Sequence, residues 1–238
     1  VHNYLLVSEL PSTLENVVLG NSAGKCWIRS EMDLGWIADT EYTGLSAGAV
    51  LPNGNVALGS KGVGGKVMVL DSNITDNYIA REFFTNDITA MAADSDGNIV
   101  FVTTAGALHK RSGADLSAIV SSGGFGSNAI KDIAIAPNGN IILAAVYASG
   151  RYICVTDGMF GAVPGVPTNY STFGNAGAVA VQPNGNIVIG NDVGSLWVCT
   201  GQLTINQTAT GLGNITDIAV QPNGNIVVGN AQGVVKIL

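Results

Sequence analysis

A ten-residue segment that recurs along the chain limits what this sequence can fold into. Residues 220–229 read Val-Gln-Pro-Asn-Gly-Asn-Ile-Val-Val-Gly and nearly duplicate residues 181–190. Weaker copies precede them, so the last Asn of the motif falls at positions 16, 55, 98, 140, 186 and 225, with separations of 39, 43, 42, 46 and 39 residues. Six units with a period of about 42 residues are typical of a repeat architecture built from one small unit.

Each unit carries the residues of a tight hairpin turn. Pro sets φ at the first corner, Asn or Asp tolerates the second, and Gly adopts the left-handed conformation that closes the turn. Short β-branched runs flank the turn, a second Gly opens a third run, and a variable fourth run follows. Four antiparallel strands per unit predict an all-β fold, a six-bladed β-propeller. We expect one domain over residues 1–238, with blades at about 1–43, 44–85, 86–127, 128–174, 175–211 and 212–238.

The two ends of the sequence decide how the first and last blades are composed. Leu238 falls where the third strand of the sixth unit ends, so we expect a three-stranded last blade. Residues 4–9 have room for one strand, the innermost of unit one or the outermost of unit six. We favour the first, because a missing inner strand would leave a hole beside the axis. The candidate fourth strands are residues 36–43, 78–84, 116–121, 168–173 and 204–210.

The segment from Asp217 to Val228 resembles the NHL-type and delta-60-type β-propeller repeats. Their core is an apolar strand, then Pro-Asp-Gly, a polar residue and a second apolar strand, and the likeness spans all six units. Gly190-Asn191 and Gly229-Asn230 depart from the charged residues that usually follow the second strand in NHL repeats. Such propellers include enzymes, protein-binding modules and components of cell surfaces and virions, so the resemblance implies a scaffold and leaves the function open.

Charge and hydropathy narrow the range of partners. Charged residues make up 11% of the chain and the net charge is -7, which argues against nucleic acid because phosphate binding depends on Lys and Arg. Apolar stretches such as residues 141–147 are far shorter than the roughly 20 residues that span a bilayer, so we expect no membrane insertion. The start of the sequence does not have the pattern of a signal peptide. Cys26, Cys154 and Cys199 have no metal-ligand spacing, and we expect no cofactor.

Candidates for catalysis are few. Of the two His residues, His109 lies in the third strand of its unit, in register with Met68 and Trp197, and that position favours a structural role. Asp94-Ser95-Asp96-Gly97-Asn98 resembles a calcium loop, but position twelve counted from Asp94 is Ala105, which cannot ligate. We therefore predict neither catalytic residues nor a metal site.

Asn and Asp recur where the loops before first strands meet the loops after second strands. We call these ten residues the polar loop face: Asn86, Asp87, Asn128, Asp132, Asn175, Asn191, Asp192, Asn214, Asp217 and Asn230. Their amides and carboxylates could bind a glycan, a peptide or a protein. The alternative, which we weigh more heavily, is that they bond their own backbone in turns. Trp27 and Trp197 could likewise serve as sugar platforms or pack in the core.

These observations favour a non-catalytic β-propeller that acts as a structural or adhesive binding module of a larger assembly. A virion (phage tail or fibre) or a bacterial surface structure fits the low charge and the surface rich in Asn, Gly and Thr, with other proteins or a surface glycan as partners. A glycan-binding lectin is one alternative. A hydrolase or lyase with an axial active site is another, and strongly perturbed ionisation of a cluster of Asp132 and Asp217 would favour it.

Overall fold

The computed structural model describes residues 4–7, 16–21, 25–30, 36–41, 44–62, 64–71, 78–122, 130–147, 150–164, 172–221 and 223–238. Up to residue 41 it describes the backbone of the strands. All regular elements in these ranges are β-strands. The chain groups into two units, Val1–Asn128 and Ala129–Leu238.

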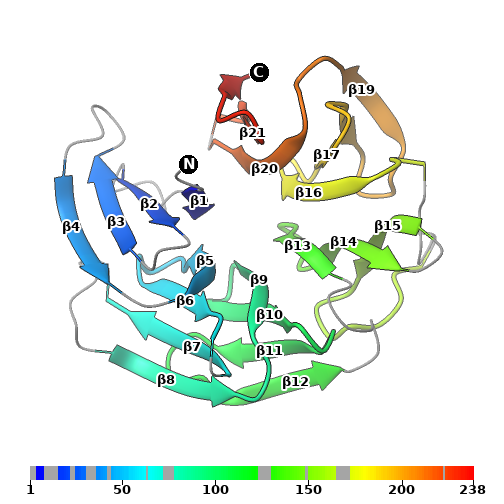
Figure 1. The fold of residues 1–238 in the computed structure, drawn as a ribbon. Helices are drawn as coiled ribbons and strands as arrows, with labels where there is room; N and C mark the ends of the chain where they lie inside the picture. The colour runs from blue at the N-terminus through cyan, green and yellow to red at the C-terminus, as the bar shows by residue number, and fades with distance from the viewer. Residues whose placement is uncertain are drawn as a thin grey trace. The chain divides into compact units, whose positions relative to one another are not determined.

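The first unit contains three four-stranded antiparallel sheets, each formed by strands that follow one another in the sequence (Figure 1). The first sheet is β1 (Tyr4–Val7), β2 (Asn16–Asn21), β3 (Lys25–Ser30) and β4 (Trp36–Glu41). The second is β5 (Leu45–Val50), β6 (Val56–Ser60), β7 (Gly65–Leu70) and β8 (Tyr78–Phe84). The third is β9 (Ile88–Ala93), β10 (Asn98–Thr103), β11 (Leu108–Ser112) and β12 (Ala118–Ser122).

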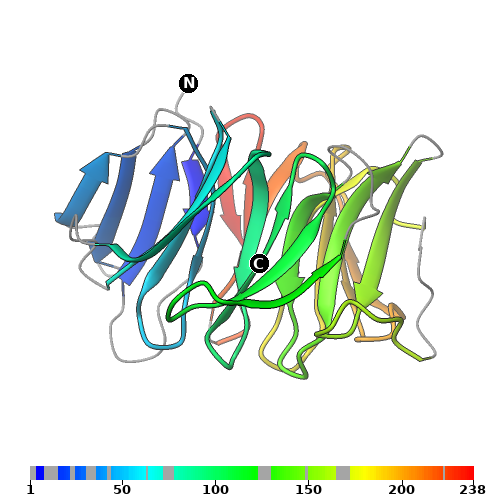
Figure 2. The same ribbon diagram turned by 90° about the horizontal axis from the view of Figure 1, so that it is seen from below.

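The second unit contains three antiparallel sheets of consecutive strands, one with four strands and two with three. The first is β13 (Ile130–Ile135), β14 (Ile141–Tyr147) and β15 (Gly150–Thr156). The second is β16 (Ala176–Val181), β17 (Ile187–Asn191), β18 (Leu196–Cys199) and β19 (Ile205–Ala209). The third is β20 (Ile215–Val220), β21 (Ile226–Asn230) and β22 (Val235–Ile237). Figure 2 shows the antiparallel strands of the sheets joined by short turns.

After the first repeat, whose turn lies outside the described residues, the predicted turn joins the first and second strands. Between β16 and β17, the side-chain Oδ1 of Asn184 accepts the N–H of Asn186 at 3.0 Å, and Gly185 has φ of 84°. The same bond and a positive-φ Gly recur at the turns around Gly54, Gly139 and Gly224. This left-handed conformation disfavours a Cβ, which explains why Gly recurs there.

A β-bulge interrupts the start of the first strands β5, β9, β13, β16 and β20. In β16, Ala176 pairs with Asn191, but Ala178 pairs with Gly190, so Gly177 has no partner across the ladder. The register shifts in the same way at Lys131 in β13, Ser46 in β5 and Thr216 in β20. A bulge turns the next side chain out of the regular alternation. Asp132 and Asp217 are the residues that follow the bulge in β13 and β20.

Consecutive sheets within each unit pack face to face through apolar side chains. Small residues of a first strand, such as Ala178 and Ala180, meet larger ones of the following sheet, such as Ile215 and Ile218. In the first unit Ala47 and Ala49 share a cluster with Phe101. Alternation of small and large side chains lets neighbouring sheets approach closely.

The strand predictions can now be compared with the structure. β1 pairs with β2, which confirms its predicted place in the first sheet, and β8 covers the predicted residues 78–84. The prediction of 116–121 was wrong by two residues: β12 begins at Ala118, because Leu116 is a buried turn residue with φ of 60°. Residues 168–171 of another predicted strand lie outside the described residues. The single domain and its blade boundaries remain predictions.

Candidate functional site

Asn191 and Asn230, two members of the polar loop face, end the second strands β17 and β21. The Oδ1 of Asn191 accepts the N–H of Val193 at 3.2 Å and that of Ser195 at 2.8 Å. Its Nδ2 donates to the carbonyl oxygen of Phe173 at 3.4 Å. Asn230 makes the equivalent three bonds in the next repeat. Both amides thus bond the backbone of the following turn and of a preceding loop, as expected of turn-capping residues.

Other members of the polar loop face in the second unit contact one another. Asn175 Nδ2 donates to Asp192 Oδ2 at 3.0 Å, and the N–H of Asp192 lies 3.4 Å from the carbonyl oxygen of Asn175. Asn214, which is exposed, accepts the N–H of Ala231 at 2.8 Å through its carbonyl oxygen. These contacts tie the loop before a first strand to the loop after the second strand.

In the first unit, Asn86 and Asp87 form the loop between β8 and β9. Asp87 Oδ1 accepts the N–H of Gly62 at 3.0 Å, and its carbonyl oxygen accepts the N–H of Thr104 at 2.8 Å. Asn86 is exposed. Asn128 lies outside the described residues. Binding of a partner by the polar loop face stays a prediction.

Asp132 and Asp217 occupy the same repeat position and make the same local bond. Oδ1 of each accepts the N–H of the following Ile at 2.8 Å. Oδ2 of Asp132 also accepts the N–H of Val179 in β16 at 2.7 Å. Asp132 therefore links β13 to the first strand of the next sheet. The corresponding residue of β16 is Ala178, which is buried.

Burial, with the negative charge of Asp217 as a second cause, raises the pKa of Asp132 to about 8, although the two backbone N–H donors lower it. A carboxyl group that keeps its proton near neutral pH is what a general acid requires, so this finding meets the condition stated for the hydrolase or lyase alternative. Against that role, both oxygens of Asp132 already accept backbone hydrogen bonds. The geometry is that of a carboxyl group that fastens two strands.

His109 lies between aromatic side chains. Its ring stacks on Phe101 with centroids 5.1 Å apart and lies 5.3 Å from the ring of Phe84. Burial, together with the charge of Arg111, lowers the pKa of His109. Its Nδ1 lies 3.0 Å from the hydroxyl oxygen of Ser121. These contacts are those of a packing residue in the middle of a sheet.

Asp94 holds its own turn. Oδ1 accepts the N–H of Asp96 at 3.0 Å and of Asn98 at 2.8 Å, while Oδ2 lies 2.9 Å from Lys110 Nζ. Burial alone would raise the pKa of Asp94, but the hydrogen bonds from the side-chain amide and backbone N–H of Asn98, together with Lys110, outweigh it and hold the pKa below its ordinary value. With donors on both oxygens, the carboxylate has little capacity left for calcium. Within the described ranges, no group of three or more His, Cys, Asp or Glu side chains has an arrangement that could hold a metal.

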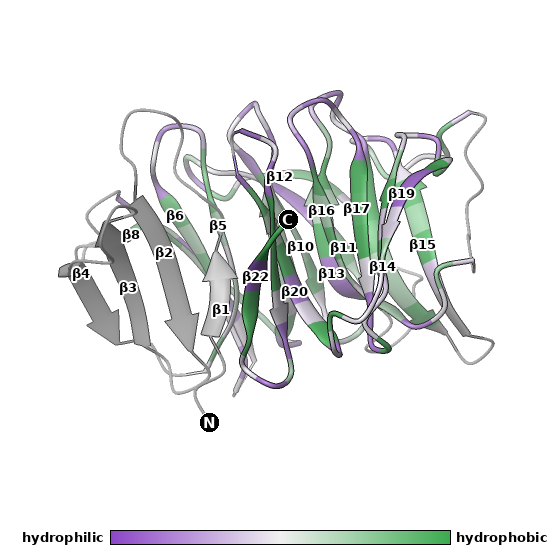
Figure 3. Ribbon diagram, turned by 90° about the horizontal axis from the view of Figure 1, so that it is seen from above, coloured by the Kyte–Doolittle hydropathy of each residue, from purple (hydrophilic) through white to green (hydrophobic). Residues whose placement is uncertain are grey.

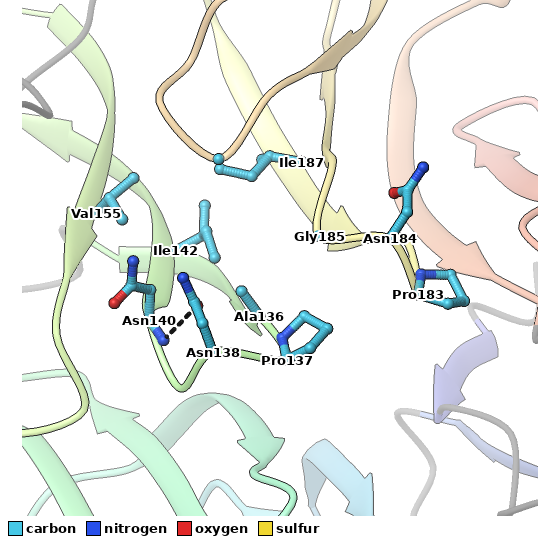
Figure 4. Close-up of a pocket in the computed structure, with 11 residues that line it drawn as sticks. Ala136, Pro137, Asn138, Asn140, Ile142, Val155, Pro183, Asn184, Gly185 and Ile187 are labelled. Atoms are coloured by element: carbon cyan, nitrogen blue, oxygen red, sulfur yellow. Dashed lines mark hydrogen bonds between the residues drawn. The ribbon is translucent and has the colours of Figure 1, made fainter.

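A cleft that the sequence did not predict lies between two turns of the second unit. Asn138 and Asn140 lie on one side and Asn184 on the other, with Ile142 and Ile187 between them (Figure 4). Its volume is about 310 Å³, and Val155, Pro137 and Pro183 complete much of its lining. The cleft combines an apolar floor with amide groups at the rim, which is the usual composition of a small-ligand site. The repeated Pro-Asn-Gly-Asn motif marks both turns in the sequence and could have indicated the cleft.

An exposed aromatic and cationic patch on β8 was also missed. The guanidinium carbon of Arg81 lies 5.0 Å from the ring centroid of Tyr78 and 5.2 Å from that of Phe83. Phe83 is 68% exposed, and Ile79, four residues earlier in the same strand, is exposed as well. We call Tyr78, Ile79, Arg81 and Phe83 the β8 patch. β8 is the last strand of its sheet. The sequence predicted a strand at these residues, but it could not show which of their side chains are exposed.

Trp197, one of the two Trp candidates, packs against the core. Its ring lies 5.3 Å from that of Phe173 in an edge arrangement, and it joins the apolar cluster between two sheets. The side chain of Trp27 lies outside the described part of the chain. A sugar platform at Trp197 would have to use the part of the ring that remains accessible.

Comparison with solved structures gives a similar fold. The WD40 domain of Pan2 from Neurospora crassa matches with a TM-score of 0.71 and 12% sequence identity, over 99% of this chain and 73% of that chain. The fold is a β-propeller. The antiparallel sheets described above are of the kind that forms propeller blades, as the repeats predict, although the comparison does not distinguish NHL-type repeats from other propeller repeats. No protein-family model matches the sequence, and no curated protein sequence matches it either. A search of the described residues for a helix able to span a bilayer finds none.

Proposed function

We propose that this β-propeller is a non-catalytic module that binds another protein within a larger assembly, such as a virion (phage tail or fibre) or a bacterial surface structure. The β8 patch carries the proposal. Tyr, Phe and Arg are enriched at the energetic centres of protein interfaces, because they bury a large area and bond through their polar ends. An exposed Phe beside a stacked Arg is costly to leave in water.

The remaining contacts agree with a module without catalysis. Asp94, His109, Asn191 and Asn230 each bond or pack within the fold, so these four candidate residues already have structural partners. The turn motif also leads us to propose NHL-type ancestry for the repeats, since Asp217 to Val228 follow that pattern closely.

The experiment is site-specific photocrosslinking in the native assembly. A benzophenone amino acid replaces Phe83 in the full chain, and the matched control replaces Ile119, an exposed apolar residue of β12 in the same unit. We expect position 83 to crosslink to a different protein, identified by mass spectrometry, and position 119 to crosslink at least about tenfold less. Equal yields at both positions, or none at 83, would contradict the proposal.

Glycan binding is a second candidate, favoured by the cleft between Asn138 and Asn184. Sugar hydroxyls pair well with amide groups, and the apolar floor could receive a sugar face. Asn184→Asp preserves the Oδ1 that accepts the N–H of Asn186 and removes the Nδ2 donor. A lectin that uses the cleft would give a glycan-array signal that weakens in this variant, whereas one that uses the Trp197 ring would lose its signal in Trp197→Ala. Absence of any signal from the parent protein would eliminate this candidate.

A further inference from the structure

The residue before the Pro-Asn-Gly-Asn turn differs between the fourth and fifth repeats: it is Ala136 in the fourth and Gln182 in the fifth. The backbone of the two turns is the same. In both, the N–H of this residue donates to the carbonyl oxygen of the last Asn at 2.8 Å, and its carbonyl oxygen accepts the N–H of the Gly at 2.8 Å. The two side chains therefore leave the backbone at equivalent places and differ only in length and polarity.

The Gln182 side chain bridges the turn of the fifth repeat to the turn of the sixth. Its Nε2 donates to the carbonyl oxygen of Gly224 at 2.9 Å, and its Oε1 accepts the side-chain amide of Asn186 at 3.3 Å. In the third repeat the side-chain amide of Asn98 donates in the same way to Asp94, at 3.0 Å. A carboxamide at this place thus satisfies an acceptor on the next turn and a donor on its own turn.

Ala136 cannot form this bridge between the fourth and fifth turns. The residues equivalent to Gly224 and Asn186 are Gly185 and Asn140. Among the residues that the structure describes, none donates a hydrogen bond to the Gly185 carbonyl oxygen or accepts one from Asn140 Nδ2. Both residues line the cleft of about 310 Å³ between the two turns (Figure 4). The cleft therefore lies where the next pair of turns holds a glutamine side chain.

In the first unit, the equivalent space between two turns is closed in another way. Leu51 stands before the turn of the second repeat, where it is 1% exposed and packs against Gly113 of the next sheet. The carbonyl oxygen of Gly97, the equivalent of Gly185, accepts the N–H of Gly113 at 3.0 Å. Of the three pairs of neighbouring turns described within a unit, two are closed by the chain's own residues. The pair that contains Ala136 is open.

The lining of the cleft suits an uncharged group on an aliphatic stem. Strands such as β17 are mostly hydrophobic and the turns that join strands are mostly hydrophilic (Figure 3). Ile142, Ile187 and Val155 offer apolar surface to a stem, and none of the lining side chains is ionisable. A carboxylate or an ammonium group would lose water there without meeting an opposite charge. Pro137 and Pro183 at the rim are exposed, so a ligand can enter from solvent.

We propose that this cleft binds a primary carboxamide on an aliphatic stem, the group that a glutamine side chain carries. The nitrogen of the carboxamide donates to the Gly185 carbonyl oxygen, and its oxygen accepts from Asn140 Nδ2. The site lies in the second unit and uses no residue of the β8 patch, so the proposal goes beyond the proposed function and does not depend on it. A glycan, the second candidate for the same cleft, is a different occupant and is one outcome of the test.

Titration of the ¹⁵N-labelled full chain with N-acetyl-L-glutamine N-methylamide tests the proposal. We expect saturable shifts with a dissociation constant on the order of 1 mM, as for a ligand of this size. The largest shifts should occur at the amide of Asn186, whose peptide group contains the Gly185 carbonyl, and at the side-chain amide of Asn140. The glutamate analogue of the probe has the same size and should bind at least about fivefold more weakly, because it carries a charge.

The same carboxamide occurs in free L-glutamine and in glutamine within a polypeptide, and a second titration distinguishes these sources. Free L-glutamine should bind at least about threefold more weakly than the blocked probe, because its ionised ammonium and carboxylate groups find no charged partner in the lining. Equal or tighter binding of free L-glutamine would overturn a polypeptide as the source of the carboxamide.

Two variants exchange the residue before the turn. Ala136→Gln gives the fourth repeat the side chain of the fifth. It should raise the midpoint of thermal unfolding by about 2–4 °C through the added hydrogen bonds and weaken binding of the probe at least about tenfold. Gln182→Ala opens the pair of turns at Gly224 and should create a second site for the probe. Ala136→Glu, the matched control, has no N–H donor and should give no rise in the midpoint.

Four results would overturn the proposal. They are no saturable binding of the glutamine probe, equal affinity for the glutamate probe, undiminished binding of the glutamine probe to Ala136→Gln, and tighter binding of N-acetylglucosamine than of the glutamine probe at the same signals. The last result would assign the cleft to a glycan. Crosslinking at Phe83 tests the β8 patch separately, so the failure of one proposal leaves the other intact.

Discussion

The fifth and sixth repeats have nearly the same sequence around their turns but different surroundings. Residues 181–190 and 220–229 form the same hairpin, with Val181 paired to Ile187 and Val220 to Ile226. Gly190 nevertheless lies against Ile215 and Ile218 of the following sheet, while the same Cβ position at Gly229 meets nothing closer than 3.9 Å. The local sequence sets the hairpin, and the neighbouring strands set how deeply it is buried.

The largest expected difference in the free energy of unfolding is between equivalent substitutions in the third strands β18 and β22. Leu196→Ala empties a buried site next to Val198 and Ile226 and should lower the free energy of unfolding by about 2–4 kcal/mol. Val235→Ala, its equivalent in β22, should change it by less than about 0.5 kcal/mol, because that side chain is exposed. Urea unfolding measures both. Similar losses in the two variants would show that β22 is covered in solution.

Adding a methyl group sharpens the same comparison. A Cβ at Gly190 would lie 2.6 Å from Ile215 Cγ2 and 2.8 Å from Ile218 Cδ1, so Gly190→Ala should destabilise by about 1–3 kcal/mol through overpacking. Gly229→Ala has room and should be neutral or slightly stabilising. Thermal unfolding of the pair is the measurement. A neutral Gly190→Ala would mean that the sixth sheet packs less tightly on the fifth than the structure shows.

The two repeats also differ at the residue after the bulge, Ala178 in β16 and Asp217 in β20. With the pKa of Asp132 raised to about 8, the unfolded chain releases this proton above pH 4 while the folded chain retains it. The contribution of Asp132 to stability is therefore largest below about pH 4 and falls by up to about 1.4 kcal/mol per pH unit until pH 8.

Asp217→Ala gives β20 the residue that β16 has and removes the charge that disfavours the Asp132 carboxylate. The pKa of Asp132 should fall, and the pH range over which stability decreases with rising pH should end below pH 8. Carboxyl ¹³C titration of Asp132 measures the shift directly. An unchanged titration would assign the raised pKa to burial alone.

The smallest effect concerns the turn asparagines. Asn191→Ala and Asn230→Ala remove equivalent bonds, but Asn191 is fully buried and Asn230 is half-buried. We expect a loss of about 2 kcal/mol at Asn191 and about 1 kcal/mol at Asn230, because water can replace the missing partner only at the more exposed site. Equal losses of unfolding free energy in the two variants, measured by chemical denaturation, would show that burial does not determine the effect.

Turn chemistry made much of the fold predictable from sequence, because Pro, Asn and Gly each favour one position of the same turn. Strand β8 followed from its spacing. The bulges did not, since Lys131, Gly177 and Thr216 share no side-chain property that requires one. Leu116 was misplaced because a left-handed Leu is uncommon and depends on a buried pocket for its side chain.

The candidate site was less predictable than the fold. The repeat register predicted that Asn175 and Asp192 lie in neighbouring loops. It could not show that the side-chain amides of Asn191 and Asn230 form hydrogen bonds with backbone groups. Predicting the cleft requires knowing that two turns from different repeats lie side by side. Predicting the β8 patch requires knowing which side chains of that strand are exposed. Each depends on contacts between units of the repeat that no single unit encodes.

Near-identical hairpins create a hazard during folding, because β17 and β21 could each pair with the first strand intended for the other. Every pairing in the described sheets joins strands that are consecutive in the sequence, and the first two strands of a repeat are separated by a turn of a few residues. Closing so short a loop is much faster than bringing together strands from different repeats. The tight turn therefore favours correct pairing kinetically: the second strand of each repeat pairs with its own first strand before the similar strand of a neighbouring repeat can.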